Sequence, residues 1–190
     1  MIHDEFLQRF TEAAATIRQG DPREESTDLG PLITREHFER VDGYVQRARA
    51  VGIEVVFGGG SNEELGGLYY RPTLFREPPR DADVVQHEVF GPVLTIQRFG
   101  SEEEAVALAN DTTYGLAAIV YTGDPDRAER VSSALVAGTV WVNSFYVRDL
   151  RAPFGGSRNS GIGREGGIWS FDFYSDVKNV CMAPWNSTND

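Results

Sequence analysis

Apolar residues recur every three or four positions in two N-terminal stretches and predict two amphipathic helices. The first stretch covers residues 4–19 and stops before Gly20 and Pro22, two residues that end helices. The second follows Thr34, a residue type that caps helix N-termini, and ends near Gly52. Because each stretch is apolar on one face only, we expect both helices to pack against a core.

Short β-branched runs alternate with helical patterns along the rest of the chain. Predicted strands cover residues 53–57, 69–75, 93–99, 117–122, 139–143 and 177–182. Ser101 and Asp124 open predicted helices, which end at Asn110 and before Gly138. Pro72 indicates that its run lies at a sheet edge or at a bulge. The alternation predicts an α/β fold with a mostly parallel open sheet and flanking helices.

The charge balance excludes several classes of partner. The 190 residues include 18 Lys and Arg against 29 Asp and Glu, a formal charge of −11 that repels phosphate backbones and anionic lipid. We therefore expect neither nucleic acid nor membrane as a partner. No apolar run approaches the roughly 20 residues that cross a bilayer. The acidic start after Met1 does not match a secretory signal, so we expect a cytoplasmic protein of one domain.

Three further features of the sequence predict neither a nucleophile, nor a metal site, nor a dinucleotide-binding loop. The only cysteine, Cys181, excludes an internal disulfide, and its apolar neighbours favour an inert packed residue over a nucleophile. The histidines are scattered, so no metal site is predicted: His3, His37 and His87. Three glycines match G-x-G-x-x-G, but no strand pattern precedes them, so we interpret them as an ordinary glycine loop: Gly161, Gly163 and Gly166.

Two stretches predict ligand contacts. In the first, Glu88 and Phe90 lie on a turn before a strand, where a carboxylate can bind a sugar diol and a ring can pack on an aromatic base. In the second, Arg148, Arg151 and Phe154 follow the strand over 139–143. Loops at the carboxyl ends of parallel strands carry ligand sites, and the planar fork of arginine suits a substrate carboxylate. The alternative for Arg148 is a surface ion pair with the adjacent Asp149.

The chain resembles the aldehyde dehydrogenase superfamily over nearly its whole length. The resemblance is carried by four motifs in the family's order, at residues 88–93 (EVFGPV), 110–116 (NDTTYGL), 138–143 (GTVWVN) and 153–156 (PFGG). Within the superfamily, residues 147–153 and 161–167 look most like hydroxymuconic and carboxymethyl-hydroxymuconic semialdehyde dehydrogenases of aromatic catabolism. Their substrates carry carboxylates, which agrees with the independent interpretation of Arg148.

The resemblance implies a role for each matching position. Glu88 would bind the nicotinamide-ribose hydroxyls of NAD or NADP, and Phe90 would pack beside the nicotinamide. The residues around the aldehyde substrate would be Asn143, Arg148, Arg151 and Phe154. By the same resemblance, residues 1–175 form part of the catalytic domain, residues 176–183 form an oligomerisation strand, and residues 184–190 form a mobile tail.

Members of the superfamily are much longer than this chain, and the parts that this chain is expected to lack are required for their activity. Starting at Met1, the chain lacks the dinucleotide-binding domain, the general-base glutamate and the nucleophilic cysteine, so no catalytic residue is assigned. Without a thiolate no thiohemiacetal forms and no hydride is transferred, so we expect the isolated chain to be inactive. The expected partners are a second copy or a longer aldehyde dehydrogenase chain. Two alternatives are a non-enzymatic interaction module and one half of a split dehydrogenase.

Overall fold

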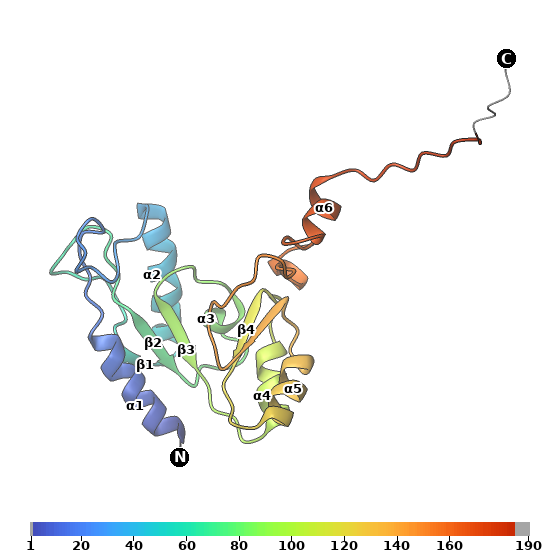
Figure 1. Ribbon diagram of the computed structural model, residues 1–190. Coiled ribbons are helices and arrows are strands. Elements are labelled where there is room, and N and C mark those ends of the chain that lie inside the picture. Colours follow the sequence, from blue (N-terminus) through green and yellow to red (C-terminus); the bar gives the residue numbers. More distant parts are fainter. Residues whose placement is uncertain (1, 185–190) are drawn as a thin grey trace. The chain divides into compact units, whose positions relative to one another are not determined.

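The computed structural model describes residues 2–184, which divide into two compact units at Thr112 and Thr113. Unit 1 comprises the described residues up to Thr112 and unit 2 those from Thr113 onward (Figure 1). The elements of unit 1 are α1 (Ile2–Ala15), α2 (Arg35–Ala50), β1 (Glu54–Phe57), β2 (Thr73–Arg76), α3 (Asp83–Gln86), β3 (Val93–Ile96) and α4 (Glu102–Asn110). Those of unit 2 are β4 (Ala117–Val120), α5 (Pro125–Ala134), β5 (Thr139–Val142), a 3-10 turn (Arg158–Ser160) and α6 (Trp169–Tyr174).

The strands of unit 1 form a three-stranded sheet in the order β1-β2-β3. β1 is antiparallel to β2, and β2 is parallel to β3 with Thr73 opposite Val93. The central strand begins at Thr73, whose N–H donates to the Pro92 carbonyl at 2.8 Å. Pro72 has no N–H to donate and lies just outside the strand. Because β2 is the central strand, the predicted sheet edge is wrong, whereas the alternative of a bulge agrees with the register shift between Val55 and Phe57 of β1.

The core of unit 1 lies between α2 and the sheet. The apolar face of α2 buries Val41 and Val45 completely, and both belong to one cluster with the fully buried Phe75 of β2. The Thr34 hydroxyl caps the helix by accepting from the N–H of His37 at 3.1 Å. The predicted second helix is thus confirmed, together with its cap and its buried face.

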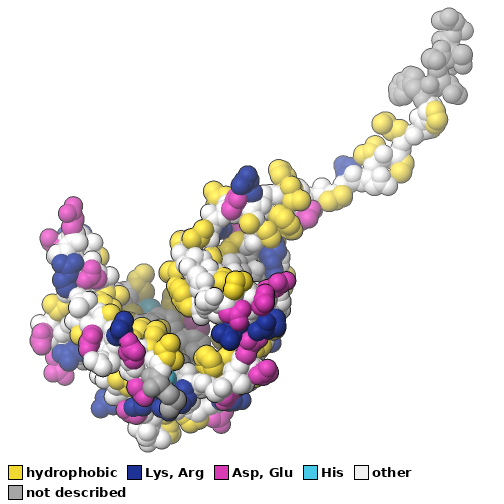
Figure 2. Space-filling model, turned by 60° about the horizontal axis from the view of Figure 1, so that its bottom comes forward, with side chains coloured by type: hydrophobic (Ala, Val, Ile, Leu, Met, Phe, Trp, Pro, Cys, Tyr) yellow, Lys and Arg dark blue, Asp and Glu magenta, His cyan; other side chains and the backbone are white. Residues whose placement is uncertain are grey.

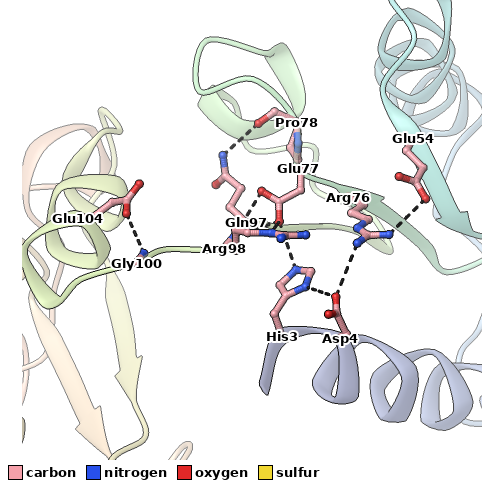
Figure 3. Close-up of polar contacts among 10 residues, drawn as sticks. All are labelled: His3, Asp4, Glu54, Arg76, Glu77, Pro78, Gln97, Arg98, Gly100 and Glu104. Atoms are coloured by element: carbon pink, nitrogen blue, oxygen red, sulfur yellow. Dashed lines mark hydrogen bonds and ion pairs between the residues drawn. The ribbon is translucent and has the colours of Figure 1, made fainter. Parts of the chain in front are cut away.

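Helix α1 is attached to the sheet largely by charged groups, which are drawn in Figure 3. His3 lies within 3.1 Å of Asp4 and 3.2 Å of Glu77, and Arg98 donates to Glu77 at 3.1 Å. The hydrogen bond from His3 lowers the pKa of Asp4. The helix ends at Ala15 instead of residue 19, because the chain turns there to pair with the segment near Leu29.

In unit 2, β4 and β5 form a two-stranded parallel sheet with Ala117 opposite Thr139. Helix α5 packs against both strands. It is capped by Asp124, which accepts from the N–H groups of Asp126 and Arg127, and these bonds hold the pKa of Asp124 below its ordinary value. The predicted α/β fold is confirmed, with parallel pairing between β2 and β3 and between β4 and β5.

Beyond α6 the described chain carries apolar side chains into solvent (Figure 2). The predicted strand over residues 177–182 does not form in this single chain. Cys181 is exposed, so the prediction that it packs in a core is wrong. Apolar periodicity alone cannot supply the second backbone that a strand needs. The role of this segment in oligomers stays a prediction, and residues 185–190 of the predicted tail lie outside the described residues.

Within residues 2–184, no helix is long and apolar enough to cross a membrane.

Gly91 allows the turn before β3 to approach α2 closely. A Cβ at this position would lie 2.7 Å from Cγ2 of the fully buried Val41. We expect Gly91→Ala to lower the free energy of unfolding by about 1–3 kcal/mol, because the core must shift to admit the methyl group. Urea denaturation followed by circular dichroism measures the change. Gly60→Ala is the matched control, since its Cβ would meet no atom within 4 Å. Equal destabilisation by both variants would contradict this explanation.

Candidate functional site

The turn at residues 88–92 is held in place by α2. Arg40 donates to the Val89 carbonyl at 2.9 Å, and the ring Nε2 of His37 lies 2.5 Å from the Phe90 carbonyl oxygen. The Val89 side chain is itself buried in the core cluster. Two carbonyl groups and one apolar side chain therefore fix the path of the backbone.

This path presents Glu88 and Phe90 to solvent. Phe90 is 66% exposed and has a φ of +57°, which is uncommon for a residue with a large side chain. Its ring is tilted against that of His37, with centroids 5.9 Å apart. The Glu88 side chain is also exposed. A carboxylate and an aromatic ring thus lie two residues apart on a fixed turn, and these are the groups that the predicted cofactor contact requires.

Asn143 lies directly after β5 in unit 2, where its side chain binds backbone. Its amide oxygen accepts from the N–H of Thr122 at 2.9 Å, and its amide nitrogen donates to the Thr122 carbonyl at 2.8 Å. Its own N–H donates to the Val120 carbonyl at 2.9 Å. The structure therefore places Asn143 at the predicted end of the sheet but uses its amide to join the ends of two strands.

The structure brings together Arg148 and Phe154, and their predicted contact with an aldehyde stays a prediction. The Arg148 guanidinium carbon lies 4.4 Å from the centre of the Phe154 ring, within cation–π range. One guanidinium nitrogen donates to the Glu165 carboxylate at 2.6 Å. Glu165 also pairs with Phe154 through two backbone hydrogen bonds, of 2.7 and 2.8 Å. Sequence reasoning missed Glu165, whose only signal is that it is an acidic residue within a run of glycines.

Arg151 forms a separate pair. Its guanidinium donates to the Asp149 carboxylate from Nε, at 3.0 Å to Oδ1 and 3.2 Å to Oδ2, and from Nη2, at 2.7 Å to Oδ2. The suggested ion pair between Arg148 and Asp149 is therefore wrong, because Asp149 pairs with Arg151 and Arg148 pairs with Glu165. The Arg151 side chain is 88% exposed and that of Arg148 only 35%, so a ligand would meet the less hydrated guanidinium at Arg148.

The glycine run after Phe154 surrounds a shallow pocket of about 320 Å³, lined also by Glu165, Phe173 and Tyr174. A 3-10 turn precedes Gly161, so the strand that a dinucleotide fingerprint requires is not there. Arg164 donates to two carbonyls of the run itself, those of Gly156 and Gly163. These facts agree with an ordinary glycine loop.

Among residues 2–184, no three His, Cys, Asp or Glu side chains are grouped so as to hold a metal ion.

Comparison with known proteins identifies the family. The sequence pattern that defines the aldehyde dehydrogenase family matches residues 1–180. The chain is 48% identical over 185 residues to a 2-hydroxymuconic semialdehyde dehydrogenase of Pseudomonas sp. strain CF600, covering 95% of this chain and 38% of that protein. It is 42% identical, with the same coverage, to a 2-aminomuconic 6-semialdehyde dehydrogenase of Pseudomonas sp..

A solved structure of betaine aldehyde dehydrogenase from Staphylococcus aureus, in complex with NAD+, matches with a TM-score of 0.88 at 37% identity. The match covers 98% of this chain and 40% of the other. The chain therefore belongs to the aldehyde dehydrogenase family. It spans about 38% of the length of the curated relatives that it matches. Relatives with 48% and 44% identity are named for 2-hydroxymuconic semialdehyde, and one with 43% identity, from Bacillus subtilis, is named for betaine aldehyde.

The pairing of Asp149 with Arg151 predicts a change in titration. Hydrogen bonds from Arg151 hold the pKa of Asp149 below its ordinary value. We expect Arg151→Ala to raise the pKa of Asp149 toward the usual range, because the favourable bond to the ionised form is lost. Carbon-13 NMR of aspartate carboxyl groups during a pH titration measures this. Arg148→Ala is the control and should leave Asp149 unchanged. An Asp149 pKa that rises in the control instead would show that Arg148 is its partner.

Proposed function

We propose that this chain is the C-terminal catalytic-domain portion of an NAD(P)-dependent semialdehyde dehydrogenase, which oxidises an aldehyde bearing a carboxylate to the corresponding acid. The observation that carries the proposal is the half-buried Arg148 guanidinium, stacked on Phe154 in the loop after β5. Loops at the carboxyl ends of parallel strands are where α/β proteins bind ligands. The names of two relatives with 48% and 44% identity, both 2-hydroxymuconic semialdehyde dehydrogenases, support the same substrate class.

Arg148 has the means to bind a substrate carboxylate. A guanidinium carries five N–H donors, and the bond to Glu165 occupies one nitrogen. Phe154 covers one face of the group and so limits its orientation. A charge-assisted pair with a carboxylate would form at the remaining donors, where partial burial weakens competition from water. Asn143 and Arg151 remain proposed neighbours of the aldehyde, although the structure shows their side chains bound to Thr122 and Asp149.

Glu88 and Phe90 are the proposed cofactor contacts. The exposed Glu88 carboxylate would accept hydrogen bonds from the ribose hydroxyls, and the exposed Phe90 ring would pack beside the nicotinamide. When bound, NAD or NADP supplies the acceptor for hydride. Because His37 and Arg40 hold the carbonyls of this turn, the ring and the carboxylate keep their spacing in the free chain.

The nucleophile and the general base are proposed to come from protein outside these 190 residues. The only cysteine in the sequence, Cys181, is exposed and receives a hydrogen bond from Asn179 at 3.4 Å. The exposed apolar segment at residues 177–182 is proposed to pair with another backbone, either of a second copy or of a longer aldehyde dehydrogenase chain. We place the enzyme in the cytoplasm.

Removing Arg148 tests the proposed substrate class. In the active enzyme that contains this segment, we expect Arg148→Ala to reduce kcat/KM for a carboxylate-bearing semialdehyde by about 30-fold or more, as for a buried charge pair of about 2 kcal/mol or more. The methyl ester of the same semialdehyde should lose much less, because it has no charge to pair. Steady-state kinetics on both substrates gives the comparison, with Arg23→Ala as the matched control, since Arg23 is an exposed arginine that pairs with Asp21 and has no proposed ligand contact. Equal losses on acid and ester would make Arg148 a structural residue.

The isolated chain should not oxidise aldehydes. We expect no aldehyde-dependent NADH formation by absorbance, because an exposed thiol with no histidine near it in the sequence is a poor nucleophile. The Cys181→Ser variant should behave identically. Turnover that survives this substitution would reveal another reactive group in the chain, and turnover abolished by it would make Cys181 the nucleophile.

A further inference from the structure

The loop that joins β5 to Arg148 has an unusual backbone. Asn143 has a φ of +49° and Tyr146 a φ of +61°, in the left-handed region that non-glycine residues rarely adopt. Each such residue costs free energy and persists only where surrounding contacts specify it. Core packing does not supply these contacts, because Phe145, Tyr146 and Val147 are all largely exposed.

Hydrogen bonds at its two ends specify the loop instead. At its start, Asn143 is bound to Val120 and Thr122 as described above. At its end, the indole Nε1 of Trp141 donates to the Val147 carbonyl at 2.7 Å. The Trp141 ring also contacts the rings of Phe145 and Tyr146, with centroids 5.8 and 6.4 Å away. The loop is therefore folded back onto a side chain of the strand it leaves.

The bond at Val147 acts directly on Arg148. The Val147 carbonyl and the Arg148 N–H belong to one planar peptide unit, so a donor that fixes the carbonyl also fixes the start of Arg148. From this position the guanidinium reaches Phe154 and Glu165. Trp141 is part of β5, which is paired along its length with β4, so its backbone is held by the hydrogen bonds of the sheet.

We propose that Trp141 is a positioning residue, whose indole N–H holds the Val147–Arg148 peptide and thereby sets the place of the Arg148 guanidinium and the selectivity for carboxylate-bearing aldehydes. The proposal rests on the proposed function of Arg148 for its effect on selectivity. Its effect on the order of the loop does not depend on any substrate.

The first test measures order in the chain itself. Trp141→Phe keeps a ring against Phe145 and Tyr146 but removes the N–H, and Trp169→Phe on α6 is the matched control. Nitrogen-15 relaxation of the Arg148 backbone N–H and side-chain Nε is recorded, with signals assigned by Arg148→Lys. We expect order parameters to fall below about 0.6, the range of flexible segments, in Trp141→Phe only. An Arg148 that stays as ordered as in the unsubstituted chain overturns the positioning role.

A second replacement distinguishes loss of the indole N–H from misfolding of the variant. Benzothienylalanine at position 141 keeps the size and shape of indole but has sulfur in place of the N–H. We expect it to loosen Arg148 as Trp141→Phe does, while far-ultraviolet circular dichroism and the melting temperature stay close to those of the unsubstituted chain. Loss of order with Phe but not with this isostere would overturn the role of the N–H.

Kinetics of the active enzyme that contains this segment test selectivity. With Trp141→Phe we expect KM for a carboxylate-bearing semialdehyde to rise about fivefold, the effect of one lost hydrogen bond, with kcat and the KM of its methyl ester unchanged. If Arg148→Ala abolishes the preference for the acid and Trp141→Phe leaves it intact, the proposal is overturned and the function of Arg148 stands. If neither variant changes the preference, the substrate role of Arg148 fails, and with it the selectivity role of Trp141.

Discussion

Side-chain N–H groups that donate to loop carbonyls hold two loops with proposed ligand contacts, one in each unit. In unit 1, Arg40 binds the carbonyl of Val89, and in unit 2, Trp141 binds that of Val147. Each donor lies on a regular element, and each acceptor directly precedes a residue with a proposed ligand contact. A loop carbonyl near the surface would otherwise bind water and leave the backbone free to move. The two donors convert exposed loops into fixed ones without burying them.

The same arrangement explains why the exposed groups at this site differ from ordinary surface charges. Arg151 and Asp149 are two residues apart and largely hydrated, a type of pair that contributes little to stability. Arg148 instead bridges a ring and a carboxylate that are themselves joined by backbone hydrogen bonds. Its guanidinium is therefore oriented by the Phe154 ring and the Glu165 carboxylate before any ligand arrives, which reduces the entropy lost on binding.

Features that depend on neighbouring residues were predictable from the sequence. Thr34, Ser101 and Asp124 cap helices as predicted, because a cap needs only the next three residues. The turn with Glu88 and the loop with Arg148 were also recognisable from their positions beside strands. Features that depend on contacts between distant parts of the chain could not be predicted from the sequence. Glu165 reaches Arg148 across 17 positions, and no local pattern indicates that pairing. The apolar neighbours of Cys181 predict burial in a core, but burial also requires a partner surface, and the residue is exposed.

All the apolar side chains that are fully shielded from water in the described structure belong to unit 1. Unit 2 is built on two parallel strands of four residues each, and both strands are edges. A two-stranded sheet is marginal without a hydrophobic core, so local opening of unit 2 costs less free energy than unfolding of unit 1. We therefore expect the amide hydrogens of unit 2, including those of the loop that carries Arg148, to exchange with solvent before those in the core of unit 1.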